Sequence, residues 1–176
     1  MKKLNSKIFF YLSNGLSLSR APLAFIFLCQ SPKLRAIACI LAMLTDSIDG
    51  FLARKANSTS KFGAIIDPLM DKFFVYFALL ILFIENKISI LEWVAFTSRD
   101  VAVFLFGGYL ISVSLLKTYE VKSIIIGKIS TALQFLFLIL ISLNYKIPSA
   151  AYIIFIPLSL SFLLELFLGE KDPKKN

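Results

Sequence analysis

Long apolar runs separated by short polar connectors constrain the fold of this 176-residue chain more than any other feature of its sequence. Hydrophobic residues make up 58% of the chain, which contains 18 phenylalanines. A soluble domain usually carries about 45–50% apolar residues. Because one bilayer crossing takes roughly 20 helical residues, the runs predict an all-α integral membrane protein with about six transmembrane helices.

Polar residues between the apolar runs set the expected limits of these helices. They are expected over Leu16–Cys29, Leu34–Ala53, Gly63–Ile84, Ile88–Ser114, Ile124–Leu143 and Ser149–Leu168. The preceding stretch Lys7–Ser13 is expected to lie along the membrane interface. Arg20 interrupts the first run before any small-residue cleavage site, so we expect this segment to be retained rather than removed as a signal peptide. No internal repeat or linker is visible, which predicts one domain over residues 1–176.

Lysines and arginines are distributed unevenly over the two sides of the expected membrane domain. Eleven lie on the side of the termini and four on the other side, namely Lys33, Arg35, Lys87 and Lys146. This excess predicts that both termini and the two longer polar connectors face the cytoplasm of a bacterial cell membrane. The net charge of +8 needs no nucleic-acid partner, because a basic rim that meets anionic membrane lipids accounts for it.

Four aspartates lie in two neighbouring apolar segments. Asp46 and Asp49 are three residues apart, and Asp67 and Asp71 are four apart, so each pair shares one face of its helix. A carboxylate near hydrocarbon is costly unless it faces metal, water or a partner. The chain has no histidine, which excludes imidazole chemistry. Carboxylates alone suit hard divalent cations, and a pair of such ions can hold an in-line displacement at phosphorus.

Small residues accompany the aspartates at regular intervals. Gly50 and Gly63 leave space beside the carboxylates for a substrate, and close helix–helix packing is the alternative use of that space. The letters D-x-x-D-G-x-x-A-R, eight further residues, and G-x-x-x-D-x-x-x-D resemble the signature of the CDP-alcohol phosphatidyltransferase family at every fixed position. In this sequence the fixed positions are Asp46, Asp49, Gly50, Ala53, Arg54, Gly63, Asp67 and Asp71.

The resemblance implies an enzyme of the membrane that transfers a phosphatidyl group from CDP-diacylglycerol to an alcohol and releases CMP. It implies that Asp46, Asp49 and Asp67 hold divalent metal, with two Mg²⁺ or Mn²⁺ ions expected. Asp71 is then the general base that deprotonates the acceptor hydroxyl, and it is also a candidate metal ligand. The charge bias agrees, because it places these aspartates at the cytoplasmic side, where the nucleotide of the donor lipid is found.

The same resemblance assigns the nucleotide pocket. Gly50, Ala53 and Gly63 are expected to line the site of the CDP moiety, with Arg54 near its phosphates. Members of the family are often homodimers, so a homodimer is expected here as well.

The alcohol acceptor is less strongly indicated by the motifs. The stretches 13–20, 59–64 and 67–72 resemble both the members that make phosphatidylglycerol phosphate and the eukaryotic-type cardiolipin synthases. The stretch 127–134 is similar to the former group, although Ser130 stands where that group has lysine. Ser98-Arg99-Asp100 resembles the Ser-Arg-Glu stretch of the glycerophosphate enzymes, yet with aspartate in third place it is nearer to the cardiolipin type.

Charge provides a separate argument on the acceptor. Glycerol 3-phosphate is a small dianion, and a pocket for it needs fixed cations; the candidates are Arg99, Lys122 and Lys128. The alternatives are an ion pair of Arg99 with Asp100 or another carboxylate, and lysines whose ammonium groups reach the interface.

Glycerol 3-phosphate is therefore the expected acceptor, with phosphatidylglycerol phosphate and CMP as products. The alternative within the family is a cardiolipin synthase that uses phosphatidylglycerol as acceptor. The alternative of another class is an intramembrane cation or proton transporter, whose carboxylates would lie near the bilayer centre between repeats.

Overall fold

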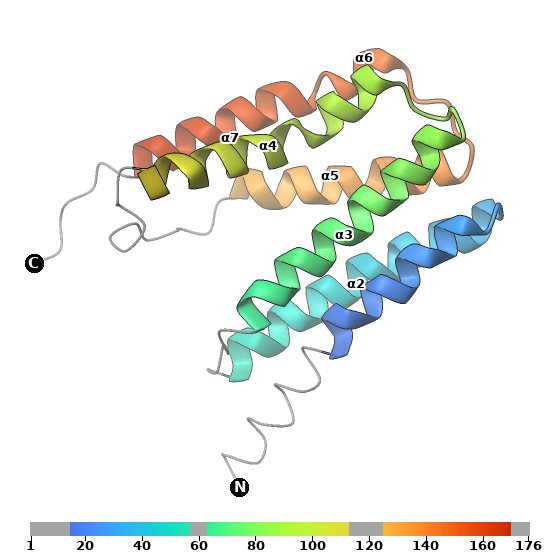
Figure 1. The fold of residues 1–176 in the computed structure, drawn as a ribbon, viewed down its shortest axis with the longest axis horizontal. Helices are drawn as coiled ribbons and strands as arrows, with labels where there is room; N and C mark the ends of the chain where they lie inside the picture. The colour runs from blue at the N-terminus through green and yellow to red at the C-terminus, as the bar shows by residue number, and fades with distance from the viewer. Residues whose placement is uncertain (1–14, 57–62, 113–124, 170–176) are drawn as a thin grey trace, which may run out of the picture. The chain divides into compact units, whose positions relative to one another are not determined.

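The computed structural model describes residues 15–56, 63–112 and 125–169, and every regular element in these ranges is helical (Figure 1). A helix over residues 15–25 leads into a 3-10 turn, η1 (Ile26–Leu28). The following helices are α2 (Pro32–Ala56), α3 (Gly63–Ile84), α4 (Ile90–Ser112), α5 (Ile125–Ser142), α6 (Ser149–Tyr152) and α7 (Phe155–Gly169). The all-α prediction is confirmed for this part of the chain.

The apolar runs located most helices well. The predicted helix Gly63–Ile84 coincides with α3 at both ends, and α2, α4 and α5 lie within three residues of their predicted limits. The interfacial stretch 7–13 lies outside the described residues. No helix in the described ranges is long and apolar enough to cross a membrane, so the expected spans stay a prediction.

The last predicted helix, over 149–168, is wrong as a continuous element, because it is broken into α6 and α7. Pro157 has no N–H to donate to the carbonyl of Ile153, and a proline ring clashes with the carbonyl four residues earlier. The amide of Ile156 instead donates to Ile153 at 3.0 Å, which closes a tighter turn at the break.

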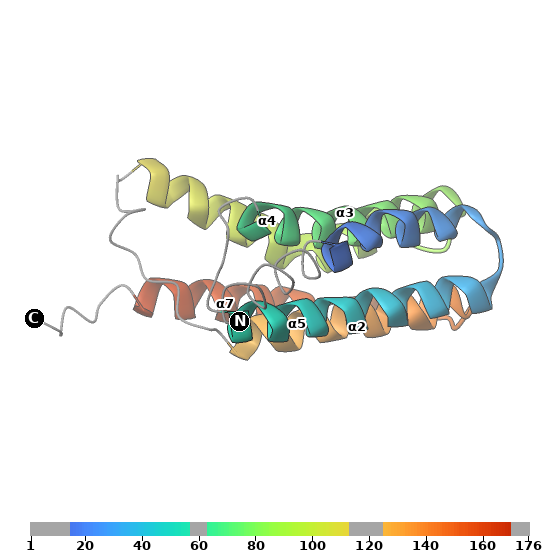
Figure 2. The same cartoon turned by 90° about the horizontal axis from the view of Figure 1, so that it is seen from below.

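The chain divides into two compact units, Met1–Ile88 with Phe137–Lys146, and Ser89–Leu136 with Ile147–Asn176. Helix α5 contributes to both. In the first unit the chain reverses after η1, so that α2 runs antiparallel to the helix over 15–25 (Figure 2). The inner face of α2 consists of small buried residues, Ala38, Cys39 and Ala42. Small side chains let neighbouring helices approach closely, and η1 contacts both α2 and α3.

Asparagines end two helices of the first unit in the same way. Asn86 follows α3 with a φ of 56°, a left-handed conformation that asparagine tolerates better than most residues. The backbone amide of Asn86 donates to the carbonyl of Phe83, and the backbone amide of Lys87 donates to the carbonyl of Leu82, both at 2.9 Å. This is the hydrogen-bond pattern of a Schellman motif. Asn144, with a φ of 64°, ends α5 in the same manner.

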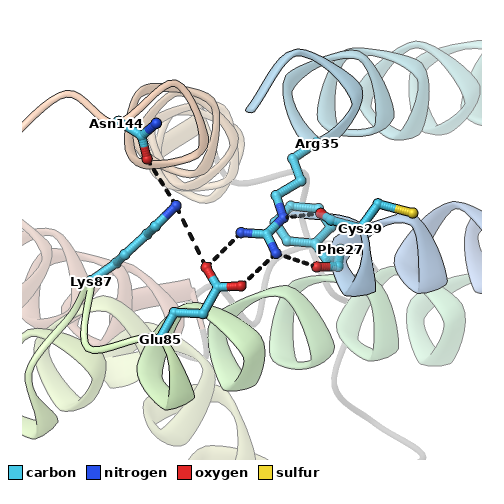
Figure 3. A network of polar contacts seen from close by, with 6 residues as sticks. All are labelled: Phe27, Cys29, Arg35, Glu85, Lys87 and Asn144. Carbon is cyan, nitrogen blue, oxygen red and sulfur yellow. Dashed lines mark hydrogen bonds and ion pairs between the residues drawn. The ribbon is translucent and has the colours of Figure 1, made fainter. Parts of the chain in front are cut away.

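A buried arginine of α2 joins η1 to the end of α3 (Figure 3). Arg35 of α2 is 1% exposed, and its guanidinium binds both carboxylate oxygens of Glu85 at 2.6 Å. It also donates to the carbonyls of Phe27 and Cys29 at 2.6 and 2.7 Å. Lys87 extends the network, because its ammonium lies 3.5 Å from Glu85. The sequence indicated Arg35 only as one of the four cations on the side away from the termini, and its burial and its partners come from the fold.

We expect the contribution of Glu85 to stability to depend on pH. The hydrogen bonds from Arg35, followed by the charges of Arg35 and Lys87, hold the pKa of the Glu85 carboxyl below its usual value, against the opposite effect of burial. A carboxylate with a lowered folded-state pKa stabilises above its unfolded-state pKa of about 4.3 and loses this contribution as the pH falls through the folded-state value. The stability difference between the wild type and Glu85→Gln should therefore shrink below about pH 4 in unfolding titrations. A constant difference from neutral to acidic pH would contradict this.

In the second unit, α4 packs against α6 and α7. Ser89 and Glu92 form a capping box at the start of α4, in which the Ser89 amide donates to the Glu92 carboxylate at 2.7 Å. The hydroxyl of Ser149 donates to the same carboxylate at 2.7 Å and so links α6 to this end. On α5, the Gln134 amide donates to the carbonyl of Phe96 at 3.0 Å. These bonds join α5 and α6 to α4.

Candidate active site on helices α2 and α3

The aspartate motif lies on two consecutive helices of the first unit that contact each other. Asp46 and Asp49 are ten and seven residues before Ala56, the last residue of α2. Asp67 and Asp71 are four and eight residues after the start of α3. With a rise of about 1.5 Å per residue, all four lie within roughly 15 Å of the helix ends that the connector 57–62 joins. The antiparallel pair therefore brings both aspartate pairs to the same end of the unit (Figure 1).

The structure describes the side chains of only part of this motif. Those of Asp49 and Asp67 lie outside the described residues, as do those at the nucleotide positions Gly50, Ala53, Arg54 and Gly63. Asp71 is partly buried, and Asp46 is exposed. Among the side chains that are described, no group of three or more metal-ligating residues gathers. The metal and nucleotide assignments stay predictions.

Arg20 pairs with an aspartate of the motif, although the sequence assigned it no part in the site. It lies in the helix over 15–25, is 1% exposed, and places Nη2 3.2 Å from Oδ1 of Asp46. The Asp46 side chain is 47% exposed, so this ion pair holds the carboxylate while leaving it accessible. A signal was present in the sequence, because Arg20 is the only charged residue between Lys7 and Lys33. A charge in such an apolar run needs a partner.

Of the proposed acceptor cations, Arg99 has the most defined setting. It lies on α4 in the second unit, and its Nη1 donates to Oγ1 of Thr131 on α5 at 2.8 Å. Its Cζ lies 5.0 Å from the centre of the Phe162 ring on α7. Lys128 is exposed on α5, and neither contact of Arg99 involves it. Lys122 lies outside the described residues. The Arg99 side chain therefore packs against α5, whereas the Lys128 side chain on α5 is exposed.

The position at which the sequence departs from the glycerol 3-phosphate pattern is also described. Ser130 is fully buried on α5. By helical spacing it shares a face with Gly127 and Gln134, and Gln134 bonds to α4. A lysine at this position would bring a charge into the packed face of α5.

Comparison with known proteins identifies the class. The sequence model of CDP-alcohol phosphatidyltransferase matches residues 10–164, so the chain belongs to this family of phosphatidyltransferases. Membership favours the transferase prediction over the transporter alternative. No solved structure matches the chain.

Curated relatives carry a more specific name, CDP-diacylglycerol–glycerol-3-phosphate 3-phosphatidyltransferase. The one from Aquifex aeolicus is 34% identical over 124 residues, which is 67% of each chain. The one from Rickettsia felis is 29% identical over 121 residues, 69% of this chain and 65% of the relative. A relative from Wigglesworthia glossinidia brevipalpis is 55% identical over 47 residues, 27% of this chain and 26% of the relative. The chain is thus matched to about two thirds of the longer-aligned relatives.

Proposed function

We propose that this protein transfers the phosphatidyl group of CDP-diacylglycerol to glycerol 3-phosphate and forms phosphatidylglycerol phosphate and CMP. The observation that carries the proposal is the placement of the complete aspartate motif on two contacting antiparallel helices, α2 and α3. The names of the relatives support glycerol 3-phosphate as the acceptor. The aspartate motif supports CDP-diacylglycerol as the donor of the phosphatidyl group.

The donor atoms of the site suit a hard divalent cation. Asp46 offers an accessible carboxylate beside Arg20, and the remaining motif ligands also carry only oxygen donors. In our proposal Asp46, Asp49 and Asp67 hold two Mg²⁺ or Mn²⁺ ions. When bound, such ions neutralise charge on the phosphates of the donor lipid.

The proton transfer is proposed for Asp71. Its carboxylate takes the proton of the acceptor hydroxyl, and the hydroxyl oxygen forms a bond to the phosphorus that carries diacylglycerol. The bond from this phosphorus to the CMP oxygen breaks, and CMP leaves with the electron pair. Gly50, Ala53, Gly63 and Arg54 are proposed to hold the cytidine nucleotide, and Arg99, Lys122 and Lys128 are proposed for the acceptor phosphate.

We propose further that the helices lie in a membrane, with the site facing the cytoplasm. Helix α2 supports this, because it has a second apolar face opposite its small-residue face. The members of this outer face are 42–51% exposed, namely Leu34, Ile37, Leu41, Leu44 and Ile48. A continuous apolar face that is left exposed is typical of a surface that lipid or a partner covers. The expected homodimer and the single domain rest on the sequence alone.

The test is an acceptor panel. The purified protein is incubated in detergent micelles with labelled CDP-diacylglycerol and, separately, glycerol 3-phosphate, phosphatidylglycerol, inositol, serine and glycerol. A labelled product, phosphatidylglycerol phosphate, is expected only in the incubation with glycerol 3-phosphate. Cardiolipin as the main product, or an equal yield with another alcohol, would contradict the proposed acceptor.

Removal of divalent metal is expected to abolish turnover, because Arg54, the one cation among the fixed positions of the motif, supplies a single charge and does not replace two divalent ions between the carboxylates and the phosphates. The measurement is CMP release in excess EDTA, followed by titration with Mg²⁺ or Mn²⁺. EDTA saturated with Mg²⁺ beforehand is the control. Turnover that persists in excess EDTA would exclude the metal-dependent mechanism.

A further inference from the structure

The position of Gly127 on α5 is explained by Arg99 and not by the backbone. No glycine in the described ranges has a positive φ, so Gly127 is not needed for its conformation. A glycine inside a helix is unfavourable compared with alanine. A Cβ at this position would lie 3.1 Å from Nη2 of Arg99 and 3.2 Å from Cε2 of Phe162. Both separations are tighter than ordinary contacts, so the missing side chain makes room for the guanidinium beside the ring.

Thr131 completes the setting one turn further along α5. Its hydroxyl donates to the carbonyl of Gly127 at 3.1 Å and accepts from Nη1 of Arg99 at 2.8 Å. The hydrogen of the hydroxyl is therefore engaged within the helix, which turns a lone pair towards Arg99. Thr131 and Phe162 are neutral groups that contact the guanidinium.

We propose that Gly127, Thr131 and Phe162 are positioning residues that hold Arg99 in the orientation in which it binds the acceptor phosphate. This inference rests on the proposed function and deepens it, because it names what sets the affinity for the acceptor. A guanidinium recognises phosphate through N–H groups that lie in one plane, so its orientation determines how many hydrogen bonds it donates to the phosphate. A side chain ordered before binding also has less freedom to lose when the phosphate arrives.

The test separates acceptor binding from the rest of the reaction. Gly127→Ala is expected to raise the KM for glycerol 3-phosphate roughly ten-fold, with kcat and the KM for CDP-diacylglycerol changed less than about two-fold. Gly108→Ala on α4 is the matched control, because a Cβ there meets nothing within 4 Å. Thr131→Val should raise the same KM, and Thr131→Ser should restore it, since serine keeps the hydroxyl.

Three outcomes would overturn the inference. One is a KM for glycerol 3-phosphate in Gly127→Ala that equals that of Gly108→Ala. Another is a loss of kcat with both KM values unchanged, which indicates a structural role alone. The third is a Thr131→Ser variant no better than Thr131→Val. If the wild type forms no phosphatidylglycerol phosphate, the proposed function fails together with the inference, whereas a normal wild type with unaffected variants removes the inference alone.

Discussion

Replacement of Asp71 by asparagine is expected to lower kcat about 10²–10⁴-fold, the usual contribution of a general base. Asparagine keeps the size and polarity of the side chain but cannot accept the proton of the acceptor hydroxyl. Binding of CDP-diacylglycerol should be retained, because the proposed nucleotide positions are untouched. The measurement is single-turnover CMP release, together with binding of the donor lipid in the absence of acceptor.

The pH profile distinguishes a base from a residue that only supports the fold. In the wild type, kcat/KM should fall on the acidic side as the base becomes protonated, and Asp71→Asn should lack this limb. Asp46→Asn is the comparison variant, since it alters a proposed metal ligand held by Arg20. It should require more Mg²⁺ while keeping the acidic limb. Near-normal turnover of Asp71→Asn would remove Asp71 as the base.

Helix positions were predictable because they depend on local pattern. The apolar run from Gly63 to Ile84 is bounded by polar connectors, and α3 occupies the same residues. The spacing of the aspartates likewise predicted shared faces on helices, and α2 and α3 contain all four positions. The break between α6 and α7 was also readable in principle, because Pro157 removes a backbone donor.

Pairings between distant residues were not predictable from one sequence. Arg20 pairs with Asp46 and Arg35 with Glu85, yet spacing along the chain relates residues only within one helix. The sequence counted Arg35 only among the cations of one side, whereas the structure buries it in the first unit. The surroundings of Arg99 depend in the same way on how α4, α5 and α7 pack. The sequence therefore indicates which charged residues need a partner, and only the fold shows which residue that partner is.

Loss of Arg35 is the change expected to destabilise the protein most. Arg35→Ala should lower the free energy of unfolding by about 3–5 kcal/mol, as is found when one partner of a buried ion pair is removed. The substitution leaves the Glu85 carboxylate without its main partner and the carbonyls of Phe27 and Cys29 without their donor. Lys33→Ala, an exposed change on the same helix, is the control. Both variants are measured by denaturant unfolding in detergent.

A double-mutant cycle shows whether the loss comes from the ion pair. Arg35→Ala combined with Glu85→Gln should destabilise less than the sum of the single changes, because the neutral amide no longer needs a countercharge. Arg35→Lys should recover only part of the stability, since an ammonium lacks the planar fork that reaches both carboxylate oxygens and two carbonyls. If Arg35→Ala destabilised no more than Lys33→Ala, the network in Figure 3 would contribute little to the fold. The contacts with two carbonyls and with η1 argue against that result, because they join α2 to the turn that precedes it and to the end of α3.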